Sequence, residues 1–83
     1  MQKSVKIYTL STCSHCKATK KLLGDLNVSY DCTDIDLLDT VERASTLEEV
    51  KKYNPNCTFP TIIINGDTII IGYREKEIKE ALA

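Results

Sequence analysis

Two cysteines, Cys13 and Cys16, stand at the boundary between residues 5–10, which are rich in strand formers, and residues 17–23, which favour a helix. The first sulfur would then lie at a helix N-terminus, where unpaired backbone N–H groups and the helix dipole favour negative charge. A thiolate is such a charge, and it is the reactive form of cysteine. We therefore predict that Cys13 is a nucleophile and that Cys16 is its resolving thiol.

Two cations near the first sulfur would stabilise its thiolate. His15 lies between the two cysteines, and Lys17 follows Cys13 by four residues. A helix N-terminus and neighbouring cations together bring a cysteine pKa from about 8.5 into a range of roughly 3.5–7.5. We expect Cys13 to attack a disulfide and form a mixed disulfide, from which Cys16 displaces the product as it pairs with Cys13.

The composition excludes several other classes of function. With 83 residues, 42% hydrophobic and 28% charged, the chain is typical of one soluble domain covering residues 1–83. Its net charge is −1 and its Lys and Arg residues are scattered, which argues against a nucleic-acid partner. The longest apolar runs, 62–64 and 69–71, are far shorter than the ~20 residues that span a bilayer. Because the N-terminus also lacks the features of a signal peptide, we expect a cytoplasmic protein. We also expect a monomer with no membrane partner.

The cysteine content admits other interpretations of the motif. In a reducing compartment, a Cys-x-x-Cys beside a βαβ pattern favours redox chemistry over a structural disulfide framework. Zinc is an alternative, with His15, Cys32 or Cys57 as further ligands, but a structural zinc site usually shows two spaced ligand pairs. The chain has one such pair, so we predict no metal. Cys32 is expected in the core, and Cys57 in a buried or half-buried position.

Hydrophobic periodicity and turn signals predict the order β-α-β-α-β-β-α. A helix between the first two strands makes them a parallel, right-handed βαβ unit, and Asn65-Gly66 between two isoleucine runs is a strong hairpin signal. Unbroken isoleucine predicts strands covered on both faces. The expected elements are strand 3–10, a helix capped by Ser11 or Thr12 and ended by Gly24 or Asn27, strand 28–32, a helix from a cap at Asp39 to Asn54, strands 61–64 and 67–71, and a last helix after Gly72.

These elements would form a four-stranded mixed sheet flanked by helices on both faces. Apolar stripes on the first and last helices would face the sheet: Ala18, Leu22 and Leu26, and Ile78, Ala81 and Leu82. The second helix carries a stripe of Val41, Ala44, Leu47 and Val50 at helical spacing, with Asn54 following at the helix end. Sheets of this kind bind or react at the carboxyl ends of their parallel strands, which is where Cys13 is expected.

Three motifs follow one another in a characteristic order. They are Ile7-Tyr8-Thr9 ahead of Cys13-Ser14-His15-Cys16-Lys17, then Thr58-Phe59-Pro60, and then the hairpin with Gly72 before a final helix. In this order and spacing, the chain resembles the glutaredoxin family of the thioredoxin fold over essentially its full length. The resemblance implies an α/β, thioredoxin-like fold and a thiol-disulfide oxidoreductase that reduces protein or mixed disulfides.

The resemblance also implies a binding surface around the two thiols. Pro60 would be the family's cis-proline facing the disulfide, which would leave the backbone groups of Phe59 free to pair with an extended substrate. Thr58, Gly72 and Tyr73 would complete the surface that binds the substrate or a small thiol. The partners implied are disulfide-containing proteins, with no bound cofactor and with glutathione or another small thiol as the reductant.

The chain departs from the family at positions that contact glutathione. Leu10 replaces the lysine that usually lies three residues before the nucleophile, and Ser14-His15 replaces the common Pro-Tyr pair. Where the family has Gly-Gly and a small or acidic pair, this chain has Ile71-Gly72-Tyr73-Arg74. These departures leave the dithiol mechanism unchanged, and they favour an alternative: a glutathione-independent reductase recharged by a thioredoxin-type or ferredoxin-dependent enzyme.

A third hypothesis belongs to a different class of protein. Some glutaredoxins bind an iron–sulfur cluster between two subunits through the nucleophilic cysteine and bound glutathione, and zinc could occupy a similar motif. A binding module of this kind would show metal or a visible absorption band when purified without oxygen.

Overall fold

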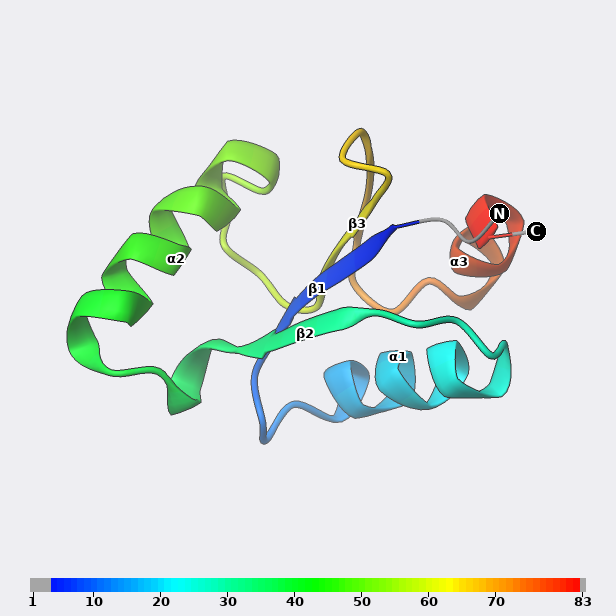
Figure 1. Ribbon diagram of the computed structural model, residues 1–83, viewed down its shortest axis with the longest axis horizontal. Coiled ribbons are helices and arrows are strands. Elements are labelled where there is room, and N and C mark those ends of the chain that lie inside the picture. The colour runs from blue at the N-terminus through cyan, green and yellow to red at the C-terminus, as the bar shows by residue number, and fades with distance from the viewer. Residues whose placement is uncertain (1–3, 83) are drawn as a thin grey trace.

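The computed structural model describes residues 4–82 and contains one mixed sheet with helices on both faces (Figure 1). Lys3, the expected start of the first strand, lies outside the described residues. The elements are β1 (Val5–Thr9), α1 (Ser14–Asp25), β2 (Asp31–Asp34), the 3-10 helix η1 (Ile35–Leu37), α2 (Thr40–Tyr53), β3 (Thr61–Ile64), β4 (Thr68–Ile71) and α3 (Glu75–Leu82).

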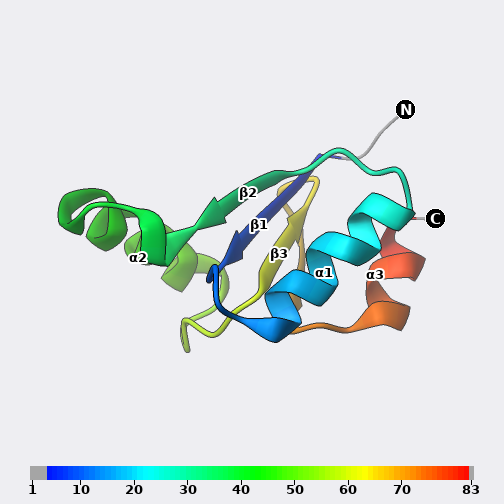
Figure 2. The same ribbon diagram turned by 90° about the horizontal axis from the view of Figure 1, so that it is seen from below.

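The sheet has the strand order β2-β1-β3-β4. β1 and β2 are parallel, whereas β1 with β3 and β3 with β4 are antiparallel. Figure 2 shows α1 and α3 side by side on one face of the sheet and α2 on the other. The predicted thioredoxin-like architecture is therefore confirmed, and the Cys-x-x-Cys motif lies at the carboxyl end of the central strand β1.

Alternation along β1 divides the core into two clusters. Val5 and Ile7 face α1 and α3, where they meet Leu22, Leu23 and Ile78. On the opposite face, Tyr8 of β1 and Ile63 of β3 pack with Ile35 of η1 and Val50 of α2, and these four residues form the α2 cluster. Burying both faces of β1 fixes the strand between the layers, and this holds the turn that carries Cys13.

The N-cap of helix α1 lies one residue after Thr12 and two after Ser11, the two predicted caps. Cys13 itself is the N-cap, with an extended backbone (φ −82°, ψ 122°), so Ser11 and Thr12 lie in the preceding turn. The helix ends in a Schellman motif, in which the N–H of Val28 donates to Leu23 and that of Asn27 to Gly24. Asn27 adopts the left-handed φ of 56° that this ending requires, as its predicted role as terminator implied.

Strand β2 begins three residues later than predicted. Asp31–Asp34 pairs with β1, whereas the preceding residues 28–30 complete the helix ending and lead into the strand. Because β2 is an edge strand, Cys32 is exposed, so its predicted core position is wrong. The stripe on α1 also ends early, since Leu26 is the C-cap and is 37% exposed.

Helix α2 has the predicted cap but covers less of the sheet than predicted. The Asp39 carboxylate accepts a hydrogen bond from the Glu42 N–H at 2.8 Å. Val50 is fully buried, but Val41, at the other end of the predicted stripe, is 78% exposed. The N-terminal half of α2 therefore lies away from the sheet, as Figure 1 shows.

The β3–β4 hairpin turns at Asn65-Gly66, where both residues have positive φ values, 55° and 77°. β3 is buried along its whole length, as predicted. β4 is not covered on both faces, so that prediction is wrong for this strand: Ile69 and Ile71 are each 39% exposed. β4 is an edge strand, and the residues that the sheet contributes to the α2 cluster come from β1 and β3.

Helix α3 packs Ile78, Ala81 and Leu82 against the first cluster, as predicted. None of the helices within residues 4–82 has the length and apolar character needed to cross a membrane.

Candidate active site

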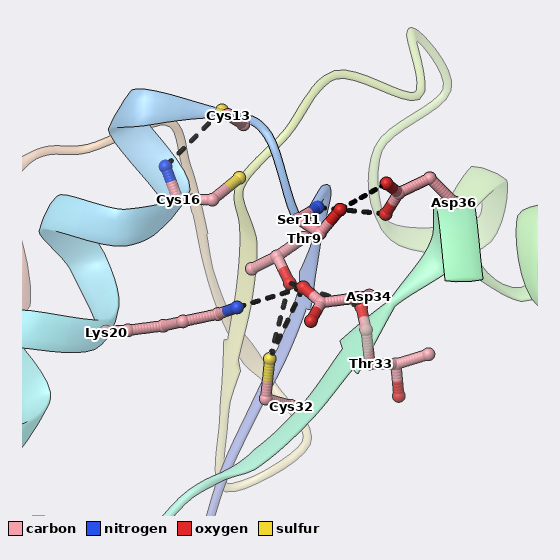
Figure 3. Close-up of polar contacts among 9 residues, drawn as sticks. All are labelled: Thr9, Ser11, Cys13, Cys16, Lys20, Cys32, Thr33, Asp34 and Asp36. Carbon is pink, nitrogen blue, oxygen red and sulfur yellow. Dashed lines mark hydrogen bonds and ion pairs between the residues drawn. The ribbon is translucent and has the colours of Figure 1, made fainter. Parts of the chain in front are cut away.

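The Cys13 thiol is placed by a tight turn between β1 and α1. The N–H of Cys13 donates to the Leu10 carbonyl at 3.1 Å, and the N–H of Cys16 donates to the Cys13 sulfur at 3.4 Å (Figure 3). Cys13 is half-buried, whereas Cys16 is fully buried. Solvent therefore reaches the first sulfur, while the second lies behind it on the first turn of the helix.

The environments of the two thiols move their pKa values in opposite directions. The pKa of Cys13 is lowered, first by a hydrogen bond from the Cys16 side chain and then by backbone N–H groups of Cys16 and His15, against an opposing effect of burial. The pKa of Cys16 is raised to about 12, chiefly by burial. The accessible thiol therefore ionises more readily than an ordinary cysteine, and the buried thiol is protonated at neutral pH.

His15 and Lys17 both have exposed side chains beside Cys13. The lowered pKa of Cys13 comes from hydrogen bonds, and the contribution of His15 is through its backbone N–H. The influence of the imidazole and of the Lys17 ammonium on the thiolate remains a prediction.

The motif Thr58-Phe59-Pro60 lies against the turn that precedes α3. The Phe59–Pro60 peptide bond is cis, as the resemblance implied. The Pro60 carbonyl accepts a hydrogen bond from the Gly72 N–H at 2.8 Å, which joins the two loops. An open pocket of about 240 Å³ lies beside them, lined by His15, Phe59, Ile71, Gly72, Tyr73 and Arg74.

Four of the predicted site residues, His15, Phe59, Gly72 and Tyr73, therefore line one pocket. Thr58 and Pro60 flank Phe59 in the same loop but are not among the lining residues of this pocket. Arg74, which we did not predict as a site residue, adds a guanidinium cation, and its Nε donates to the Ile71 carbonyl at 3.0 Å. Its position just before the last helix was the signal that could have identified it.

Asn54 organises the loop that carries Phe59 and Pro60. This side chain is 1% exposed, and its amide nitrogen donates to the Thr58 carbonyl at 3.0 Å and to the hydroxyls of Thr58 and Thr61 at 2.9 and 3.2 Å. Its oxygen accepts the N–H of Asn56 at 3.2 Å. The sequence indicated only a helix end at Asn54, whereas in the structure its side chain holds the loop 55–60, here called the binding loop, through these hydrogen bonds.

We expect Asn54→Ala to destabilise the fold and to displace the binding loop. It removes hydrogen bonds from buried partners, which should cost about 2–3 kcal/mol and lower Tm by roughly 10–20 °C in a domain of this size. Thermal unfolding followed by circular dichroism measures the shift. Asn56→Ala is the matched control, because Asn56 contributes only its backbone N–H; equal Tm values for the two variants would contradict the role of Asn54.

A comparison with models of known protein families finds a match that includes the site residues. A family model described as glutaredoxin covers residues 5–69, which include both cysteines and the Thr58–Pro60 loop. The chain belongs to the glutaredoxin family. Glutaredoxins of this family are thiol-disulfide oxidoreductases, which agrees with the geometry of the two thiols.

Individual relatives span different lengths. The chain is 38% identical over 69 residues to mitochondrial glutaredoxin-2 of Rattus norvegicus. The matched region covers 82% of this chain but only 41% of the length of that protein. The chain is 32% identical over 78 residues to an uncharacterised glutaredoxin-like 8.6 kDa protein in a rubredoxin operon of Clostridium pasteurianum, covering 94% and 96% of the two chains. The clostridial relative is thus matched over nearly its whole length.

Solved glutaredoxins share the fold closely. Methanoredoxin of Methanosarcina acetivorans has a TM-score of 0.95 at 43% identity, covering 99% of this chain and 86% of that one. A glutaredoxin of Methanosarcina mazei has a TM-score of 0.88 at 49% identity, covering 96% and 78%.

Behind the glutaredoxin motif lies a polar network that we did not predict. Thr9 is fully buried, and its hydroxyl donates to the Asp34 carboxylate and lies 3.3 Å from the Cys32 sulfur. Asp34 also pairs with the Lys20 ammonium at 2.9 Å (Figure 3). The residues come from β1, α1 and β2, so no local sequence pattern identifies them as a group.

Metal ligation finds no support in the geometry of the part of the chain that the structure describes. Within residues 4–82, no three His, Cys, Asp or Glu side chains gather closely enough to hold an ion. Cys32 lies on β2, and Cys57 is half-buried in the loop before Thr58, packed against the α2 cluster.

Proposed function

We propose that this chain is a dithiol reductase of protein disulfides and of mixed disulfides, in which Cys13 attacks and Cys16 resolves. The observation that carries the proposal is the contrast between the two sulfurs. The pKa of the accessible thiol is lowered, and the pKa of the buried thiol is raised. Membership of the glutaredoxin family supports the same reaction.

In the proposed reaction, the Cys13 thiolate attacks one sulfur of the substrate disulfide, and the other sulfur departs as a thiolate. Cys16 then attacks the Cys13 sulfur of the mixed disulfide, releases the second substrate thiol and closes the Cys13–Cys16 disulfide. The two thiols supply both electrons, so the reaction needs no bound cofactor. Phe59, Pro60 and Thr58 would contact the substrate backbone next to Cys13.

We propose that the reductant is a small thiol that carries a negative charge, and glutathione fits this description. Arg74 and His15 line the pocket between the two loops, and the N-terminus of α3 follows directly. Backbone N–H groups at such a terminus favour anions. Arg74 would thereby supply a positive charge in place of the family's lysine, which is Leu10 in this chain. Gly72 and Tyr73 would contact the rest of the small thiol.

A second candidate for the electron source is a dedicated thioredoxin-type or ferredoxin-dependent reductase. Leu10 favours it, because the side chain packs against the α2 cluster and presents no charge to a glutathione carboxylate.

We also propose that the protein acts in the cytoplasm as a monomer. A Cys-x-x-Cys that follows the first strand of a βαβ unit is typical of redox motifs in a reducing compartment. Cys13, Cys16 and the pocket all come from one chain, so a second subunit need not complete the site.

One experiment compares the two electron sources. We expect the protein to reduce a glutathione mixed disulfide at physiological glutathione, with glutathione reductase completing the cycle. Turnover is followed by NADPH consumption, in parallel with an assay that replaces glutathione by a thioredoxin-type reductase. Turnover restricted to the second assay would rule out the small thiol as reductant and leave the dithiol mechanism in place.

A charge reversal tests the proposed anion site. We expect Arg74→Glu to raise the KM for glutathione roughly three- to tenfold, because a repulsive charge replaces an attractive one at a solvent-exposed site. Steady-state kinetics at low ionic strength measure the change. Lys76→Glu makes the same charge change at an exposed position of α3 outside the pocket, and an equal effect of both variants would show only a general influence of net charge.

A further inference from the structure

The resolving thiol must lose its proton before it can attack. Cys16 is fully buried, and burial raises its pKa to about 12. With no other influence in the transition state, only a very small fraction of molecules would carry the Cys16 thiolate at neutral pH. A nearby positive charge would increase that fraction.

Lys20 lies in position to supply this charge. It follows Cys16 by four residues, so both side chains lie on the same face of α1. Figure 3 shows the Lys20 side chain extending below Cys16 toward the end of β2. Among the charges near Cys16, that of Lys20 acts to lower the pKa of the thiol, while Cys13 acts to raise it.

The Lys20 ammonium is held in place. It pairs with Asp34 at 2.9 Å, and the side chains of Lys20 and Asp34 are only 27% and 23% exposed. The same Asp34 oxygen accepts a hydrogen bond from the buried hydroxyl of Thr9. The Asp34 carboxylate offsets part of the positive charge and fixes the position of the ammonium. Limited exposure to solvent strengthens the interaction of the remaining charge with a neighbouring thiol.

Other titratable groups surround Lys20 and Cys16. Cys32 faces Thr9 and Lys20 from β2, Asp36 faces Asp34 from η1, and Cys13 lies above Cys16. The pKa of Asp34 is lowered, first by the Thr9 hydrogen bond and then by that of Lys20, and the pKa of Lys20 is raised by Asp34. Both members of the pair are therefore charged at neutral pH.

We propose that Lys20, held by Asp34 and Thr9, is a positioning residue for the resolving step, in which its ammonium stabilises the Cys16 thiolate during attack on the mixed disulfide. The inference rests on the roles proposed above for Cys13 and Cys16. The Cys16 proton passes to solvent, the Cys16 sulfur bonds to the Cys13 sulfur, and the substrate sulfur departs as a thiolate that takes up a proton. The two active-site thiols are oxidised by two electrons, and the substrate disulfide is reduced by two.

Rapid mixing of reduced protein in excess with dithiobis(nitrobenzoate) separates the two steps, because each step releases one coloured thiolate. Every variant carries Cys32→Ser, since the exposed Cys32 thiol would release the same product. The first phase reports attack by Cys13, and the second, independent of protein concentration, reports attack by Cys16. We expect Lys20→Met to slow the second phase roughly three- to tenfold at neutral pH, since a higher pKa lowers the thiolate fraction and is partly offset by greater nucleophilicity. The first phase should be unchanged, and the pH profile of the second should move to higher pH.

Four further variants complete the test. Lys20→Arg should restore the second phase, and Lys20→Gln repeats the loss with a polar side chain if Lys20→Met folds poorly. Lys21→Met is the matched control, because the Lys21 side chain is 79% exposed and pairs with Asp25. A second phase with wild-type rate and pH profile in Lys20→Met, or equal slowing of both phases, would overturn the proposal. Cys16→Ser should lack the second phase entirely; its persistence there would refute the role of Cys16 rather than that of Lys20.

Discussion

Cys13→Ser is expected to lose disulfide reduction by at least about a thousandfold, or ~4 kcal/mol of transition-state stabilisation. A serine hydroxyl cannot form the anion that the helix N-terminus stabilises in Cys13, and the thiolate is the attacking species. Turnover with a protein disulfide, at saturating reductant, measures the loss. Cys57→Ser should retain activity, because the Cys57 thiol is half-buried outside the motif.

The pH dependence of alkylation provides an independent check on Cys13. Its lowered pKa means that the thiolate persists to lower pH than in an ordinary cysteine, whose pKa is about 8.5. The rate of reaction with iodoacetamide should therefore reach its plateau at a lower pH than for a cysteine peptide, and it should fall only as the pH drops through the lowered pKa. If the rate reaches its plateau only at the same pH as for the peptide, or at a higher pH, the result would contradict the lowered pKa of Cys13.

Cys16→Ser is expected to keep the first attack and to lose turnover on protein disulfides by roughly a hundredfold or more. An external thiol at millimolar concentration must then replace an intramolecular one held a single helical turn away, where effective concentrations are far higher. Protein substrates should accumulate as mixed disulfides with Cys13, which mass spectrometry of the acid-quenched reaction detects. Single-turnover attack by Cys13 serves as the internal control, since it does not require the Cys16 thiol.

The opposite outcome would change the mechanism. If Cys16→Ser turns over protein disulfides at the wild-type rate without trapped adducts, the reaction proceeds through Cys13 and an external thiol. The buried position of Cys16 would then serve packing alone.

The sequence determined the parts of this protein that depend on neighbouring residues. The spacing of Cys13 and Cys16 at a strand-to-helix junction predicted two thiols on the first turn of a helix. Asp39 was recognised as a helix cap, and Asn65-Gly66 as a hairpin turn, because each of these depends on local backbone geometry. The order of strands and helices followed from hydrophobic periodicity and the right-handed βαβ rule.

Tertiary structure decided what depends on residues distant in the chain. The exposed positions of Cys32 and Val41 follow from an edge strand and from the angle at which α2 leaves the sheet, and periodicity encodes neither. The burial that separates the pKa of Cys16 from that of Cys13 comes from packing. The pair of Lys20 with Asp34 joins residues fourteen positions apart, because parallel pairing of β1 and β2 brings the end of β2 beside α1. Local sequence thus specified the reactive sulfur, and the contacts among strands and helices set its chemical environment.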